Sequence, residues 1–186
     1  STLAEGYVNK HGLFLKKYGI TDLINDEIKM PDIIDEFELG RCYLIEEKWV
    51  EKIYDKFEKA LMNGFEGLIV TKLNTERIRD SHSVERAKIY RVVHEDSDNS
   101  ISPDDLNRIY ESICEICEGP RRKIVAIDCV DQLMYANGLE KTLGFLNKIK
   151  KNCEKNDGII LISINPDLFE KKQFMKIKGI FEEEKE

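Results

Sequence analysis

Five short apolar runs, separated by segments with helical periodicity, constrain the fold of this chain more than any other feature. The runs lie at residues 41–46, 67–72, 88–93, 124–127 and 158–164. Short apolar runs bounded by polar turns predict strands that are buried on both faces. Strands that alternate with helices pair in parallel, and right-handed crossovers place the helices on both faces of the sheet. We therefore predict a three-layer α/β domain with a mostly parallel sheet.

The segments between these runs predict helices. Their expected ranges are 48–63, 75–81, 103–117 and 139–153, and a further helix begins near Pro166. The first helix repeats an apolar side chain every four residues, and we expect these on its buried face: Trp49, Ile53, Phe57 and Leu61. Thr75 is the expected N-cap of the second helix, and Ser102 with Pro103 marks the start of the third.

Residues 1–36 differ from the rest of the chain. Short helix-like pieces there are interrupted by Gly12, Gly19 and Pro31. We expect a short helical extension or linker at 1–36, followed by an α/β domain at 37–186. The extension could dock a partner or cover the sheet edge, and we favour the second, because chain termini are more often tied down or disordered than functional.

Residues 121–133 (RRKIVAIDCVDQL) contain the most informative motif. A basic run leads into an apolar strand that ends at Asp128, and a second acid follows at Asp131. This pattern is typical of the Walker B strand, which holds Mg²⁺ and water in P-loop ATPases. The sequence contains no G-x-x-x-x-G-K-[ST] phosphate loop to accompany it. The combination predicts an ATPase fold put to another use.

Several short motifs follow one another between residues 37 and 169. They are 40–46 (GRCYLIE), 64–72 (GFEGLIVTK), 74–79 (NTERIR), 101–106 (ISPDDL), 127–128 (ID) with 137–138 (NG), and 162–166 (ISINP). In order and spacing they resemble an archaeal family called domain of unknown function 835, a distant relative of the KaiC and RecA-type ATPases. Similar sequences often have proline at the position of Thr75 and glycine at that of Cys129.

The resemblance implies a RecA/KaiC-like sheet with a degenerate nucleotide site, that is, a pseudo-ATPase. The family has no established activity that could be transferred to this chain. In a KaiC-like protein the phosphate loop follows the first strand, where this chain reads Glu46-Glu47-Lys48-Trp49. Two carboxylates would repel a triphosphate, and we expect Trp49 to fill the space that bare backbone needs. Either Glu46 or Glu47 could instead cap the helix that starts there. We therefore expect neither ATP hydrolysis nor a bound cofactor.

The carboxyl ends of the strands are the expected ligand-binding edge of such a sheet. The candidate pocket residues at this edge are Glu46, Thr71, Lys72, Asp128, Asp131 and Asn165. Asp128 and Asp131 could bind Mg²⁺ together with Glu46 if the strand ends converge. We favour the alternative that Asp128 is a relic, hydrogen-bonded to a neighbouring loop or to Lys72, and we predict no metal. Lys72 is expected to be an ion-pair partner rather than a nucleophile.

Composition restricts the partners. The net charge of −7 argues against broad binding to nucleic acid or to anionic membranes. A basic stretch at 77–91 leaves nucleic-acid binding open, although its interspersed acids favour a solvated mixed-charge surface. Five cysteines in mostly apolar segments predict free core thiols rather than a metal or redox site, and a cytoplasmic location. No apolar run is long enough to span a membrane.

Three functions remain open. The first is a non-catalytic regulatory or scaffolding module that binds another protein or a second copy of itself. The second is a nucleotide or small-ligand sensor, or an enzyme, with a rebuilt site at Glu46, Lys72, Asp128 and Asn165. The third is nucleic-acid binding through residues 77–91. The lost phosphate loop within an otherwise coherent sheet favours the first.

Overall fold

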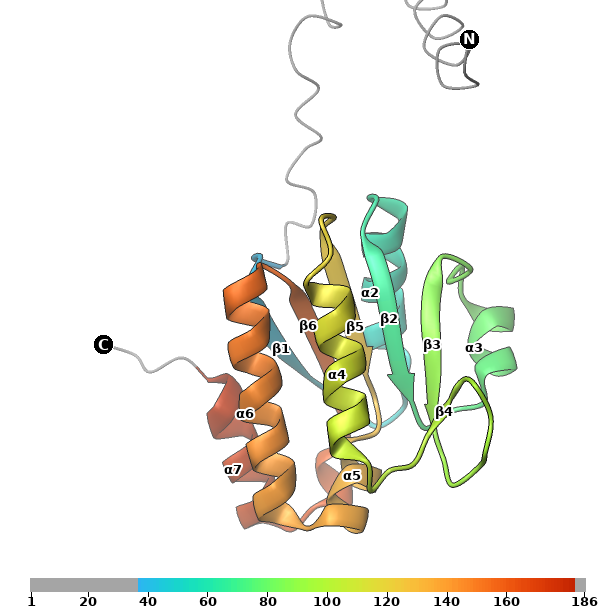
Figure 1. Ribbon diagram of the computed structural model, residues 1–186. Coiled ribbons are helices and arrows are strands. Elements are labelled where there is room, and N and C mark those ends of the chain that lie inside the picture. The colour runs from blue at the N-terminus through green and yellow to red at the C-terminus, as the bar shows by residue number, and fades with distance from the viewer. Residues whose placement is uncertain (1–36, 183–186) are drawn as a thin grey trace, which may run out of the picture. The chain divides into compact units, whose positions relative to one another are not determined.

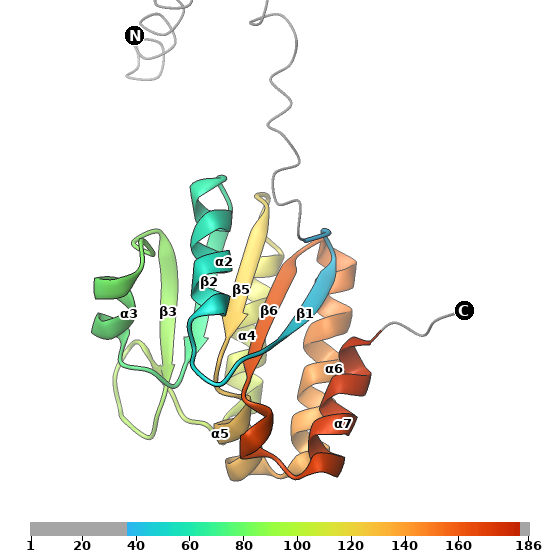
Figure 2. The same cartoon turned by 180° about the vertical axis from the view of Figure 1, so that it is seen from behind.

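A parallel sheet of six strands forms the centre of the part of the chain that is described, residues 37–182 (Figure 1). The structure is a computed structural model, and the extension expected at residues 1–36 lies outside its described residues. Helices pack on both faces of the sheet (Figures 1 and 2). The prediction of a three-layer α/β domain is confirmed.

The strands are all parallel to their neighbours. Their bounds are Arg41–Glu46 (β1), Glu66–Thr71 (β2), Ala87–Val92 (β3), Ser100–Ile101 (β4), Lys123–Ile127 (β5) and Ile159–Ile164 (β6). The order across the sheet is β1-β6-β5-β2-β3-β4. Strand β6 therefore separates β1 from β5, the two strands that carry the predicted nucleotide motifs. The two-residue strand β4, which pairs with β3, was not expected, because so short a segment shows no recognisable apolar pattern in the sequence.

The helices are distributed over the two faces. Their bounds are Lys52–Met62 (α2), Thr75–Ser81 (α3), Leu106–Cys117 (α4), Val130–Asn137 (α5), Leu139–Asn156 (α6) and Lys171–Phe181 (α7), with a 3₁₀ turn, η2, at Pro166–Leu168. Helices α4 and α6 lie side by side on one face, and α2 covers the other (Figures 1 and 2). Among these residues no helix is both long and apolar enough to cross a membrane.

One helix and four helix starts differ from the sequence expectations. The C-terminal helix expected near Pro166 begins at Lys171, after the η2 turn. Helix α5 was missed because it is short and buries few side chains, namely Val130 and Leu133. Asn74 caps α3 in place of Thr75, since its side-chain oxygen accepts the Glu76 N–H. The caps and starts of the other two also shift: Asp105 rather than Ser102 caps α4, and α2 begins at Lys52 rather than at residue 48.

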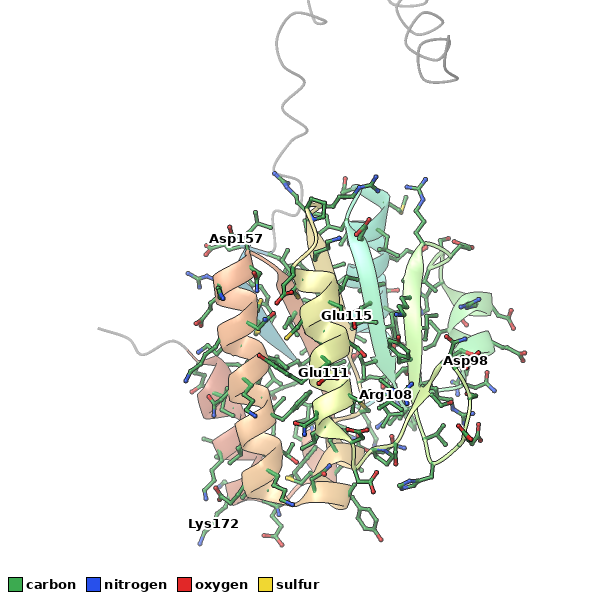
Figure 3. All side chains as sticks on the ribbon, in the orientation of Figure 1. Asp98, Arg108, Glu111, Glu115, Asp157 and Lys172 are labelled. Carbon is green, nitrogen blue, oxygen red and sulfur yellow. The ribbon has the colours of Figure 1, made fainter. Side chains whose placement is uncertain are left out.

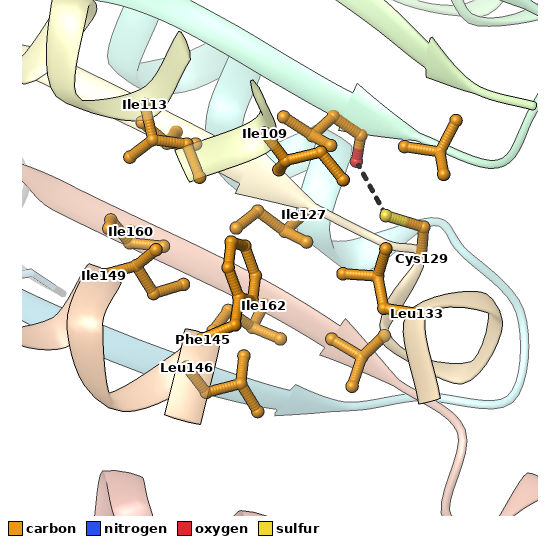
Figure 4. Packing of buried hydrophobic residues seen from close by; sticks show 14 of the residues in the cluster. Ile109, Ile113, Ile127, Cys129, Leu133, Phe145, Leu146, Ile149, Ile160 and Ile162 are labelled. Carbon is orange, nitrogen blue, oxygen red and sulfur yellow. Dashed lines mark hydrogen bonds between the residues drawn. The ribbon is translucent and has the colours of Figure 1, made fainter. Parts of the chain in front are cut away.

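The larger part of the core lies between the sheet and helices α4 and α6 (Figure 4). Alternate residues of β5 and β6 point to this side, as a strand's two-residue period requires. The fully buried members drawn there include Ile109, Ile113, Ile127, Leu146, Ile149, Ile160 and Ile162. Burying each such side chain stabilises the fold by roughly 1.5–3 kcal/mol. The opposite side of α4 carries Arg108, Glu111 and Glu115, which are exposed (Figure 3).

The second face is closed by α2, which approaches β2 closely. Ile53, Phe57 and Leu61 are buried there as predicted. Gly67 makes the approach possible, because a Cβ at this position would lie 2.4 Å from Phe57 Cζ. Trp49 does not join this face: its side chain is 70% exposed. It precedes the first turn of α2, so the helical period does not carry it to the buried side.

The cysteines are free thiols, as predicted. Cys117, Cys129 and Cys153 are buried, and Cys42 and Cys114 are partly exposed. The Cys129 thiol, at the start of α5, points to the carbonyl oxygen of Val70 on β2 (Figure 4). The three buried thiols pack as small apolar groups within the core, and Cys42 packs against it, but Cys114 does not belong to the cluster.

Candidate functional site

The Asp128 carboxylate lies at the carboxyl end of β5 and is only 2% exposed. Its Oδ2 accepts hydrogen bonds from the Tyr54 hydroxyl at 2.5 Å and from Thr71 Oγ1 at 2.6 Å. Its Oδ1 accepts the backbone N–H of Lys72 at 2.8 Å. Both oxygens are thus engaged by donors from α2 and from the end of β2. A buried carboxylate needs such donors to offset its lost hydration.

Burial raises the pKa of both acidic groups in this contact. Loss of solvent raises the pKa of Asp128, and the hydrogen bonds from Thr71, Tyr54 and the Lys72 backbone oppose that rise. Burial, followed by the nearby charge of Asp128, also raises the pKa of Tyr54 well above its ordinary value. Tyr54 therefore remains a hydrogen-bond donor across the ordinary pH range.

Lys72 and Asp131 form an ion pair next to this network. Lys72 Nζ lies 3.0 Å from each carboxylate oxygen of Asp131. Both side chains are about one quarter exposed. Lys72 therefore binds Asp128 through its backbone and Asp131 through its side chain, which is the ion-pair role expected from the sequence.

Two of the six candidate pocket residues lie elsewhere. Glu46 ends the edge strand β1 and forms an ion pair with Lys178 of α7 at 3.0 Å. Asn165 follows β6, and its Oδ1 accepts the Asp167 N–H at 3.0 Å, which caps η2. The structure thus brings together Thr71, Lys72, Asp128 and Asp131. Glu46 is kept apart because β6 lies between β1 and β5, and the Asn165 side chain is instead used to cap η2. In residues 37–182, no three His, Cys, Asp or Glu side chains are arranged to hold a metal ion.

Glu47 occupies the position at the end of β1 where a phosphate loop would begin. Its Oε2 accepts the backbone N–H groups of Lys52 at 2.7 Å and of Glu51 at 3.1 Å. Its Oε1 accepts the Ile53 N–H at 3.4 Å and the Ser163 hydroxyl at 2.6 Å. The side chain is buried, and Ser163 ties it to β6. The prediction that Glu46 or Glu47 caps this helix is confirmed for Glu47.

The N-terminus of a helix attracts anions because its first N–H groups lack partners and the helix dipole is positive there. In this protein the carboxylate of Glu47 already fills that site. Trp49 was also expected to fill space here, and this was wrong, since its ring is in solvent beside the Lys48 ammonium. A residue pattern reveals that an acid is present at this point, but not which of two adjacent acids turns inward.

Comparison with known protein families places the chain in one of them. Residues 46–181 match the family described as "Protein of unknown function (DUF835)". The chain belongs to this family. No curated protein sequence matches the chain.

Solved structures show the fold that this DUF835 member shares. One is the flagellar accessory protein FlaH from Methanocaldococcus jannaschii, with a TM-score of 0.57 and 14% identity over 78% of this chain and 70% of that one. Another is the PH0250 protein of Pyrococcus horikoshii OT3, with a TM-score of 0.51 and 12% identity over 82% and 84% of the two chains. The similarity to FlaH shows that this chain has a RecA/KaiC-like α/β fold.

Proposed function

We propose that this protein is a non-catalytic regulatory or scaffolding module, in which a RecA/KaiC-like sheet serves to bind another protein. The observation that supports this most strongly is the Glu47 carboxylate on the first N–H groups of α2. A nucleotide phosphate would need the same N–H groups. To bind, it would have to displace a buried carboxylate and break its bond to Ser163.

The engagement of Asp128 supports the same proposal. In a working P-loop ATPase the acid at this strand end must be free to hold water and Mg²⁺. Here Tyr54, Thr71 and the Lys72 backbone already occupy its oxygens. The acid serves to join α2 to the ends of β2 and β5, which is a structural role.

Calorimetry with the full 186-residue chain tests this proposal. Titration with ATP, ADP and GTP in the presence of Mg²⁺ should give no heat of binding. Glu47→Ala serves as the matched control, because it removes the carboxylate that blocks the helix N-terminus. A micromolar dissociation constant for the unmodified chain would rule the proposal out.

A small-ligand sensor is the second candidate, and the position of Asp131 in the lining of a groove favours it. This side chain forms an ion pair with Lys72 and also lines an open groove next to α5. A ligand bound there should respond to Asp131→Asn, while the buried Asp128 network remains intact. Nucleic-acid binding ranks lower, because Lys88 lies over the Tyr90 ring and Arg91 lies 4.0 Å from Glu95. A gel shift at low salt that weakens as salt rises would support it.

A further inference from the structure

A groove of about 680 Å³ opens at the carboxyl end of the sheet. It lies between α5, the η2 segment after β6, and the loop that precedes α4. Apolar side chains form most of its walls: Pro103, Met134, Tyr135, Leu168 and Phe169. The groove lies beside the Asp128 hydrogen-bond network and Asp128 does not line it. It is therefore distinct from the lost nucleotide site.

Two large side chains of the groove are unusually accessible. Tyr135 is 95% exposed and Leu168 is 55% exposed. The other side of α5 is firmly packed, with Val130 and Leu133 fully buried. Tyr135 is therefore presented to solvent by a fixed helix and not by a mobile loop. Exposed apolar side chains around a hollow mark sites of protein contact, and tyrosine is enriched among residues that dominate binding energy.

The polar groups of the groove suit a small ligand poorly. Small-molecule sites combine apolar walls with a few polar groups that converge on the ligand. Here Asp131 is held by Lys72, His94 Nδ1 contacts the Ser102 hydroxyl at 2.8 Å, and Gln173 Oε1 accepts the Glu170 N–H at 3.1 Å. Of the polar lining groups, the buried Gln132 Oε1 has no hydrogen-bond partner among the described residues, and a single such atom does not make a converging set. What the groove offers is apolar surface, which favours apolar side chains as the occupant.

The rim of the groove carries more acidic than basic side chains. Three exposed carboxylates adjoin lining residues in the sequence, at Asp104, Asp167 and Glu170, and the exposed bases next to them are Lys171 and Lys172. A fourth acid, Glu95, follows the lining residue His94 and is paired with Arg91 at 4.0 Å. Against a second copy of this chain, which carries a net charge of −7, such a rim is repulsive. Against a segment that carries lysine or arginine it is complementary.

We propose that this groove binds an amphipathic segment of a partner protein, with apolar side chains in the groove and basic side chains against the rim. Helix-in-groove recognition of this kind reads apolar anchors at helical spacing. The inference rests on the proposed function, because it names the chemistry of the partner that the module would bind.

The test is a selection of random peptides displayed on phage, with the immobilised full chain as bait. Enriched peptides should carry leucine, isoleucine or phenylalanine at helical spacing, flanked by lysine or arginine. A synthetic copy of an enriched peptide should bind the wild-type chain in fluorescence anisotropy, and more weakly as salt rises. Tyr135→Ala and Leu168→Ser should each weaken binding by about tenfold, a typical loss for a central anchor.

Met62→Ser is the matched control, since Met62 is 78% exposed on α2, away from the groove residues. It should leave peptide binding unchanged, and circular dichroism should show all three variants folded. The inference fails if the enriched peptides are acidic, if no peptide is enriched over the Tyr135→Ala chain, or if Tyr135→Ala turns a dimer into a monomer in light scattering. Nucleotide binding in calorimetry would instead refute the proposed function, so the two failures are distinguishable.

Discussion

The Tyr54 hydroxyl donates a hydrogen bond to Asp128 Oδ2 at 2.5 Å, and so joins helix α2 to the end of strand β5. Both side chains are buried, Tyr54 to 1% and Asp128 to 2% exposure. The contact holds the acid of a Walker B-like strand in a structural role.

Tyr54→Phe should destabilise the domain by about 1.5–3 kcal/mol, because a hydrogen bond to a buried charged group is lost. Urea unfolding followed by circular dichroism measures the change. Tyr135→Phe removes the same atom from a side chain that is 95% exposed and should leave stability unchanged. Equal effects of the two variants would contradict the assigned role of Tyr54.

The stability contributed by Asp128 should fall as pH rises. Burial raises its folded-state pKa, so the folded protein binds this proton more tightly than the unfolded chain does. The contribution is therefore largest below the ordinary aspartate pKa and is lost as pH rises through the raised folded value. The unfolding free energy of the wild type, measured relative to that of Asp128→Asn, should therefore decrease from pH 4 to pH 7. A difference that moves in favour of the wild type would mean that the pKa of Asp128 is lowered.

Glu47→Ala should cost about 1.5–3 kcal/mol, because the Lys52 N–H and the Ser163 hydroxyl lose a charged acceptor. Glu47→Gln keeps an acceptor oxygen and should recover part of this loss. Glu46→Ala, one residue away, removes only a surface ion pair with Lys178 and should have a smaller effect in the same unfolding assay. The reverse order would show that Glu46 is the acid that matters for α2.

Removing the Glu47 carboxylate should also create a weak anion site at the start of α2. Sulfate should then raise the melting temperature of Glu47→Ala more than that of the wild type, because ligands that bind the folded state stabilise it. Differential scanning fluorimetry across a sulfate series measures this, with chloride at equal ionic strength as the control. Identical sulfate responses would show that Glu47 does not stand in for a bound anion.

Gly67→Ala should destabilise the domain by about 1–3 kcal/mol, as overpacking usually does. The added Cβ would lie 2.4 Å from Phe57 Cζ and 2.7 Å from Leu61 Cδ2. Gly144→Ala provides the contrast, since a Cβ there meets open space within helix α6. That change should stabilise the protein by about 0.5–1 kcal/mol through the helix propensity of alanine. Chemical unfolding of both variants decides whether α2 is as tightly packed on β2 as the structure indicates.

The apolar runs predicted the strands well because a strand buried on both faces leaves a continuous local signal. Strand β6 spans Ile159–Ile164 with every residue buried, against an expected range of 158–164. Short elements with mixed exposure were missed or shifted. Helix α5 buries few residues, and α2 starts at Lys52, where the Glu47 side chain from outside the helix accepts the first N–H groups. Trp49 was misplaced for the same reason.

By itself, the sequence determined the α/β class, five of the strands, the position of an acid at the end of β5, and an acid where a phosphate loop would stand. Only the tertiary structure decided which acids meet. The order of strands in a sheet depends on how distant segments pack, and no local pattern encodes it. Because β6 lies between β1 and β5, Glu46 pairs with Lys178 while Asp128 binds Tyr54 and Thr71. The same packing turns Glu47 inward onto α2 and leaves Tyr135 exposed at the groove.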